Sequence, residues 1–283
     1  MVNDLPEIHW ILWAGTVGLE GSIPARIEAA TSWGYERVSL SPLDVARTEA
    51  DGLSATELGR QLRDANLQVV LDPVMNWYPG GARRSSRFSA FSAEDSLRMC
   101  GELGAVALTA IGGADHDVPS GELSTRFGQL CDRAADLGAQ VQLEFMPMSI
   151  LPDLAIAWQI VSTVNRSNGG LVFDTWHFFR GSPDFEVLSQ IPGDRIFAVQ
   201  LNDARADVQG TLREDTQQRL LPGDGSFDLV RAIQTLAGIG ALTWVGPEVM
   251  HPDLAAVAPQ AAAALAGDRT RSLVAAALAA RSA

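Results

Sequence analysis

The sequence contains no lysine, so all 21 of its basic residues are arginines. Schiff-base chemistry, either in lysine-type aldol cleavage or in the attachment of pyridoxal phosphate, requires a lysine amine. The missing lysine therefore excludes this chemistry. Any activation of a substrate carbonyl must come from a metal ion, an arginine or another hydrogen-bond donor.

Basic charge is scarce overall, and the formal net charge is −13. No cluster of arginines stands out that could bind nucleic acid, and an anionic surface is disfavoured at acidic membranes. The chain also lacks an apolar run of about 18 residues, and the segment Met1–Pro6 has neither the basic nor the apolar part of a signal peptide. We therefore expect a soluble, cytoplasmic protein with no nucleic-acid or membrane partner.

Cysteine is nearly absent as well, with Cys100 and Cys131 as its two occurrences. Both fall within predicted helices. This placement favours buried thiols over a disulfide framework. A bridge between the two remains an open alternative.

What the chain has in abundance is short apolar segments. Its 283 residues, 47% of them hydrophobic, are enough for one large core, and we expect a single domain over residues 1–283. Eight strands are predicted, each followed by a helical pattern. They are His9–Trp13, Arg37–Ser41, Gln68–Asp72, Ala105–Ile111, Gln140–Glu144, Gly170–Phe173, Ile196–Gln200 and Leu242–Glu248.

This alternation predicts the α/β class, as a (β/α)8 TIM barrel. The alternative is a doubly wound open sheet, which would normally carry a glycine-rich phosphate loop after its first strand. Gly15–Gly18 is a weak match to such a loop. Seven helices are predicted between the strands, over Ile23–Trp33, Thr56–Ala65, Ala93–Leu103, Pro119–Leu137, Leu154–Val164, Phe185–Ser189 and Phe227–Ala237.

Three further segments lie outside this alternation. The alanine-rich tail from Leu254 should form two helical pieces, because Pro259 and Gly267 interrupt it. Pro73–Phe88 and Asn202–Asp224 are predicted as long polar loops, and the first is either a lid over substrate or a plain flexible loop.

Oxygen-bearing side chains stand at the ends of four consecutive strands, namely Glu144, Asp174, Gln200 and Glu248. In a barrel, the carboxyl ends of neighbouring strands lie side by side around one rim. Three carboxylates brought together repel one another unless a cation neutralises them. The pattern therefore predicts a site for one divalent metal ion, and its oxygen donors favour Mn²⁺, Mg²⁺ or Co²⁺.

At these residues the chain resembles the sugar isomerases and epimerases of the xylose-isomerase-like barrel superfamily. The resemblance covers essentially the whole chain. It depends on Glu144 in Leu-Glu-Phe, on Asp174 and His177 in Phe-Asp-Thr-Trp-His, on Val199–Asp203, on Pro222–Gly225 and on Glu248. It implies that Glu144, Asp174, Gln200 and Glu248 are metal ligands. It also implies that Glu144 and Glu248 form the acid/base pair and that His177 holds a substrate oxygen.

The residue at position 200 distinguishes the epimerases from the dehydratases of this superfamily. Many epimerases of the superfamily have histidine at the position of Gln200, whereas glutamine there resembles the 3-dehydroshikimate dehydratases. The ligand spacings of 30, 26 and 48 residues also resemble the dehydratase pattern. Against it stand Met146, where some dehydratases carry a histidine, and Asp72, where an arginine would suit a substrate carboxylate.

The leading hypothesis is a metal-dependent isomerase or epimerase that acts on a hydroxy-carbonyl sugar or sugar-like small molecule. The first alternative is a dehydratase of the 3-dehydroshikimate or inosose kind. Both begin by removing a proton next to a polarised carbonyl. Phosphodiester cleavage needs more than the four histidines present, and a non-catalytic binding barrel is the remaining alternative. A homo-oligomer is compatible with every reading.

Several residues carry two interpretations. Asp174 could be an N-cap or turn residue instead of a ligand. Arg180, Arg205 and Arg219 could each bind an anionic or oxygen-rich group, or simply be solvated. Asn202 and Asp203 could orient ligands. His251 could cap a helix, while His9 and His116 are expected to be structural or exposed.

Overall fold

The computed structural model describes residues 7–79, 87–113 and 118–281. The strand order is that of a closed eight-stranded barrel, β1 to β8, so the predicted (β/α)8 fold class is confirmed. All eight strands lie where the sequence predicted them. They are β1 (His9–Leu12), β2 (Arg37–Leu40), β3 (Gln68–Val74), β4 (Ala107–Ile111), β5 (Gln140–Glu144), β6 (Gly169–Asp174), β7 (Ile196–Leu201) and β8 (Trp244–Pro247).

The helices begin and end at residues that satisfy their terminal backbone groups. Ser22 and Ser54 accept a backbone N–H at two N-termini, and Gly34 ends the first helix in the left-handed region. The helices are α1 (Ile23–Trp33), α2 (Pro42–Ala50), α3 (Ala55–Asp64), α4 (Ala93–Leu103), α5 (Ser120–Ala135), α6 (Leu154–Val164), α7 (Thr175–Arg180), α8 (Phe185–Gln190), α9 (Leu212–Asp215), α10 (Leu229–Ile239), α11 (Pro252–Ala255) and α12 (Pro259–Arg281), with short 3-10 turns η1 (Ala14–Thr16), η2 (Arg87–Ala90) and η3 (Gly193–Arg195).

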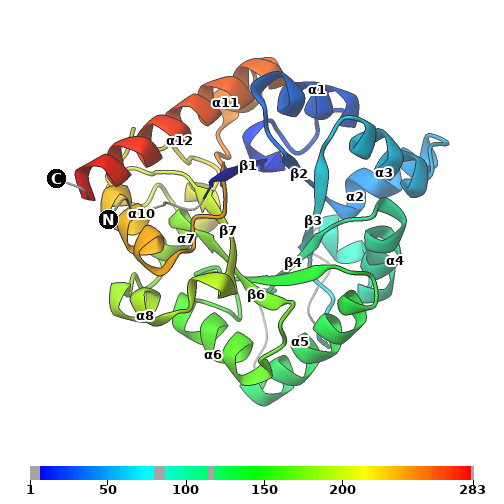
Figure 1. Ribbon diagram of the computed structural model, residues 1–283, viewed down its shortest axis with the longest axis horizontal. Coiled ribbons are helices and arrows are strands. Elements are labelled where there is room, and N and C mark those ends of the chain that lie inside the picture. Colours follow the sequence, from blue (N-terminus) through cyan, green and yellow to red (C-terminus); the bar gives the residue numbers. More distant parts are fainter. Residues whose placement is uncertain (1–6, 80–86, 114–117, 282–283) are drawn as a thin grey trace. The chain divides into compact units, whose positions relative to one another are not determined.

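The chain divides into two compact units, and the unit Arg37–Val172 holds β2 to β5 and most of β6. Its strands pair in parallel and in sequence order. Helices α3 to α6 lie along the outside of these strands in Figure 1, and α3 packs against α4 as α5 does against α6. The last pairing of the β5–β6 ladder sets Glu144 opposite Val172. Glu144 therefore lies beside Val172 of β6.

The other unit, Met1–Glu36 with Phe173–Ala283, holds β1, β7 and β8. In its parallel ladders Trp10 pairs with Val245, and Gln200 pairs with Gly246. A Cβ at Gly246 would lie 1.8 Å from the Ile11 carbonyl oxygen, so glycine is required where β8 approaches β1. Figure 1 shows the long α12, orange to red, running beside α1 and α10.

The tail differs from the prediction in one respect. Pro259 begins α12 as expected, but Gly267 lies inside a continuous helix. A Cβ there would lie 2.5 Å from the Trp33 ring and 2.6 Å from the Tyr35 hydroxyl. Gly267 therefore permits close packing of α12 and does not break it. The prediction of a break was wrong because it weighed helix propensity alone, which tertiary packing overrides.

The predicted loop Pro73–Phe88 is partly regular structure. Strand β3 continues to Val74, and Trp77 and Tyr78 are both buried. The Trp77 indole N–H donates to the Ile111 carbonyl at 2.8 Å, while the Tyr78 hydroxyl accepts the Gly113 N–H at 2.7 Å. Residues 80–86 lie outside the described part, so the lid stays a prediction.

Two expectations from composition can also be compared with the structure. Cys100 and Cys131 are buried and not bonded to each other, as predicted. Across the described residues, each helix is too short or too polar to cross a membrane.

Candidate metal and substrate site

Asp174 ends β6 and starts α7 at the same time. Its Oδ1 accepts the backbone N–H of His177 at 2.9 Å, so Asp174 is the N-cap of α7. The side chain is fully buried. The two interpretations of Asp174 are therefore compatible, because a capping carboxylate still has lone pairs for a second partner. Capping also fixes the turn from β6 into α7, and with it the relative positions of Asp174 and His177.

Asn202 orients this carboxylate from the end of β7. Its Nδ2 donates to Asp174 Oδ2 at 3.1 Å. Thr175 in turn holds Asn202, since its Oγ1 accepts the Asn202 N–H at 2.9 Å and lies 2.8 Å from the Asn202 carbonyl oxygen. All three side chains are fully buried. The predicted supporting role of Asn202 thus corresponds to a hydrogen bond to Asp174.

Glu248 follows β8, and the backbone around it is fixed by Thr16, a residue that the sequence analysis did not select. The Thr16 hydroxyl donates to the Pro247 carbonyl at 2.7 Å and accepts the Val249 N–H at 3.1 Å. A Cβ on Gly15 would lie 2.8 Å from Met250 and 3.3 Å from the Glu248 side chain. Gly15 therefore packs closely against Met250 and the Glu248 side chain.

Arg219 is the cation of this cluster. Its Nη1 donates to Asp174 Oδ2 at 3.0 Å, to Glu248 Oε2 at 2.8 Å and to the Glu248 carbonyl at 3.0 Å. Its Nη2 lies 3.5 Å from His177 Nε2, and the guanidinium carbon lies 5.5 Å from the centre of the Trp176 ring. The side chain is fully buried. Of the three candidate arginines, Arg219 is the one that contacts predicted site residues.

Burial and charge set the protonation of the cluster. Burial alone would raise the pKa of Asp174, but the charge of Arg219 and the contacts with His177 hold it below its ordinary value. Burial lowers the pKa of His177 to about 4, against the opposing effect of Asp174. Asp174 is therefore ionised and His177 neutral near pH 7, and a neutral imidazole can both donate and accept a hydrogen bond.

The low pKa of His177 predicts acid lability of the metal-free protein. The unfolded chain takes up a proton on this histidine below about pH 6.5, whereas the folded chain does so only near pH 4. The free energy of unfolding should therefore be unaffected by this histidine above pH 6.5. It should fall by about 3 kcal/mol in total as the pH drops from 6.5 toward 4, because only the unfolded chain takes up the proton in this range. Urea unfolding across this window should show the decline, and His177→Gln should flatten it. An unchanged slope in that variant would assign the decline to other groups.

The other two arginines are placed differently. The Arg180 side chain is 6% exposed, with its Nε 2.8 Å from Asp215 Oδ2, and its Nη2 donates to the Arg205 carbonyl at 2.7 Å. Asp215 also accepts the Trp176 indole N–H at 2.9 Å. The Arg205 side chain is exposed. Arg180 thus joins α7 to the polar segment that leads to Arg219.

Asp203 organises the segment after Arg219. Its Oδ2 accepts the N–H groups of Gly223 and Gly225 at 3.1 and 3.0 Å, and its Oδ1 accepts that of Phe227 at 3.0 Å. A Cβ on Gly225 would lie 2.3 Å from Asp203 Oδ1. The Pro222–Gly225 motif therefore wraps around a buried carboxylate, so Asp203 supports a loop, whereas Asn202 contacts Asp174.

The remaining predicted residues are also placed. Glu144 is buried at the end of β5, and Gln200 is buried on β7. His251 caps α11 as proposed, with its Nδ1 accepting the Asp253 N–H at 3.2 Å. His9 lies 2.9 Å from Glu36 and stacks on Trp244, while His116 is outside the described residues.

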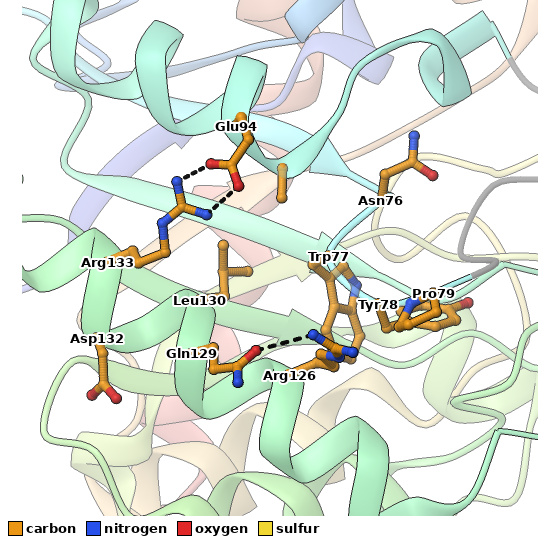
Figure 2. A pocket seen from close by; sticks show the side chains of 11 residues that line it. Asn76, Trp77, Tyr78, Pro79, Glu94, Arg126, Gln129, Leu130, Asp132 and Arg133 are labelled. Atoms are coloured by element: carbon orange, nitrogen blue, oxygen red, sulfur yellow. Dashed lines mark hydrogen bonds and ion pairs between the residues drawn. The ribbon is translucent and has the colours of Figure 1, made fainter.

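A groove of about 540 Å³ on the unit Arg37–Val172 offers little chemistry. It lies against α4, α5 and the segment after β3 (Figure 2), and none of the predicted ligands lines it. Its charged side chains already have partners, since Arg133 pairs with Glu94 and Arg126 bonds to Gln129. The groove is therefore not the candidate site.

Fold and side chains together define a class, the barrel proteins that carry carboxylates and amides at the ends of successive parallel strands. The particular family follows from comparison. The profile of the xylose isomerase-like TIM barrel family matches residues 27–270, and the chain belongs to this family.

Relatives within the family are isomerases and dehydratases. A 3-dehydroshikimate dehydratase of Pseudomonas aeruginosa is 26% identical over 90% of this chain, which corresponds to 40% of that protein. An inosose isomerase of Bacillus licheniformis is 35% identical over 44% of the chain and 45% of its own length. One from Bacillus velezensis is 23% identical over 80% of the chain and 83% of its own length. The matches to the first two relatives thus span less than half of their lengths.

Solved structures agree with the fold. The zinc-bound IOLI protein has a TM-score of 0.82 at 21% identity, over 95% of this chain and 99% of that one. An L-ribulose 3-epimerase has a TM-score of 0.71 at 14% identity, over 98% and 97%. At these identities the likeness concerns the barrel alone.

Proposed function

We propose that the protein is a divalent-metal-dependent isomerase or epimerase of a sugar-like hydroxy-carbonyl compound, such as a cyclic polyol ketone. The observation that carries the proposal is the buried contact of Asp174 and Glu248 through Arg219, beside a neutral His177. Enzyme relatives that act on inosose support the substrate class.

The donor set fits a divalent metal. Glu144, Asp174 and Glu248 carry three negative charges, and Arg219 carries one positive charge. The two remaining negative charges are neutralised by one divalent cation, which removes the cost of buried like charges. Gln200 would supply a neutral oxygen as the fourth proposed ligand. Oxygen-rich donors of this kind suit Mn²⁺, Mg²⁺ or Co²⁺.

Each side chain then has a task. A bound divalent ion would polarise the substrate carbonyl and so acidify the neighbouring C–H bond. Glu248 would take that proton as general base. Glu144 would deliver a proton to the neighbouring carbon in an isomerisation, or to the opposite face in an epimerisation. Neutral His177 and the planar fork of Arg219 would hold substrate oxygens and keep the reacting carbon in place.

A dehydratase is the second candidate, and two observations favour it. The dehydratase match extends over 90% of the chain, and Gln200 stands where many epimerases of the superfamily have histidine. In this reaction the same base removes the first proton. A hydroxyl then leaves as water from the adjacent carbon, with a proton supplied by the second glutamate. The two candidates share the first proton transfer and differ in what leaves.

Incubation in D₂O separates the two reactions. The purified chain, loaded with Mn²⁺, Mg²⁺ or Co²⁺, would be given inososes, ketoses and 3-dehydroshikimate in turn, and the products would be analysed by mass spectrometry. Deuterium gain without loss of water supports the isomerase or epimerase. Loss of water with new ultraviolet absorbance supports the dehydratase. If none of these compounds shows exchange or turnover, both candidate functions are overturned.

A further inference from the structure

Arg219 contacts two of the carboxylates that are proposed to hold a metal ion. Its Nη1 contacts Asp174 Oδ2 at 3.0 Å and Glu248 Oε2 at 2.8 Å. Asp174 and Glu248 come from two different strand ends, and both are predicted ligands. One nitrogen therefore bridges two members of the proposed ligand set.

This bridge has an electrostatic cause. Asp174 and Arg219 are fully buried, and Glu248 is nearly so. Two carboxylates in such surroundings require a cation close to them, because water does not screen their repulsion. Arg219 is a counter-ion that meets this requirement.

A divalent ion and the guanidinium compete for this place. Both would be attracted to the carboxylates of Asp174 and Glu248, and two cations beside one pair of carboxylates repel each other. We infer that metal binding displaces Arg219 from Asp174 and Glu248, so that this arginine is the counter-ion of the metal-free site only. The inference rests on the proposed metal-dependent function.

Other contacts would keep the displaced guanidinium in the site. Nη2 bonds to the Thr216 hydroxyl at 3.2 Å, and the guanidinium lies over the Trp176 ring at 5.5 Å. Neither contact uses a predicted ligand. A small shift that keeps Thr216 and Trp176 would leave Arg219 with unused N–H donors for a substrate oxygen. Metal loading would then raise substrate affinity and substrate would raise metal affinity by the same factor, because coupling between sites is reciprocal.

Metal affinity of arginine variants tests the displacement. Arg219→Met keeps much of the side-chain length without the charge, and Arg219→Lys keeps the charge without the fork. Calorimetric titration of the chelator-stripped proteins with Mn²⁺ is expected to show tighter binding by Arg219→Met, by about 5- to 150-fold, the usual span of such couplings. Arg219→Lys should bind Mn²⁺ with an intermediate affinity.

A matched control accounts for the lost charge. Arg98 pairs with Glu49 and Glu102 on the surface, so Arg98→Gln removes one positive charge far along the chain from every predicted ligand. Its Mn²⁺ affinity should stay at the wild-type value. Thermal unfolding adds an independent readout. Arg219→Met should be less stable than wild type in chelator, and this gap should narrow in saturating Mn²⁺.

The outcomes separate the inference from the function on which it rests. Equal or weaker Mn²⁺ binding by Arg219→Met overturns the displacement while leaving the metal enzyme intact. Wild-type affinity in Arg219→Lys overturns it as well, since net charge alone would then explain the Met variant. If Arg219→Met does not fold, the Lys variant decides. Failure of the wild-type chain to bind Mn²⁺, Mg²⁺ or Co²⁺ overturns the metal-dependent function itself.

Discussion

Glu248→Gln is expected to lower kcat/KM by about 10²- to 10⁴-fold, the usual contribution of a general acid or base. Glutamine has nearly the same shape, and its amide oxygen can still accept the hydrogen bond from Arg219 Nη1. It has no basic oxygen that could take a proton from carbon. Steady-state assays with a substrate identified by the D₂O screen would measure the loss, and circular dichroism would confirm that the fold is kept.

A second variant, at Glu144, tests which glutamate removes the first proton. If Glu248 removes the first proton and Glu144 delivers the second, Glu248→Gln should abolish exchange of substrate hydrogen with solvent, whereas Glu144→Gln should retain exchange and lose product. The matched control is Glu122→Gln, a half-exposed glutamate on α5 beside Arg126, which should keep wild-type kinetics. Retention of more than a tenth of the wild-type kcat/KM in Glu248→Gln would contradict a proton-transfer role.

The strands and their ends could be predicted because each depends on local sequence. A short apolar run predicts a buried parallel strand, and the polar residue after it falls at the end where barrels keep their sites. This reasoning predicted that Asp174, Gln200 and Glu248 lie at or just after strand ends, and the structure places them there. Helix α2 also had a local signal that was overlooked, because Ser41 and Asp44 form a capping box around Pro42.

Arg219 could not be selected by the same reasoning. It lies in a polar segment, 45 residues from Asp174 and 29 from Glu248. Arg180 and Arg205 stand in equally polar surroundings, so composition does not rank the three. What separates them is burial and partner, and both arise only when the chain closes. Thr16 is similar, because its hydroxyl binds backbone groups more than 230 residues away.

Asp215 carries the largest expected effect on stability. Asp215→Ala should lower the free energy of unfolding by about 3–5 kcal/mol, the cost of leaving a buried charge without its partner. The change would remove acceptors from Arg180 Nε, from the Trp176 indole and from the Gln209 N–H. Urea unfolding monitored by circular dichroism would measure it. Asp132→Ala breaks an exposed pair with Arg166 and serves as the control, with little or no loss of stability.

Asp215→Ala should also affect substrate binding, because Trp176 contacts both Asp215 and Arg219. Asp215 fixes the indole, and the guanidinium of Arg219 lies over that ring. Removing Asp215 should therefore raise KM through a less well-held Arg219. A double-mutant cycle with Arg180→Met should be strongly non-additive, since the second change removes a charge already left unpaired by the first. Additive losses, or a drop below about 1 kcal/mol for Asp215→Ala, would mean that this buried pair does not hold the segment carrying Arg219.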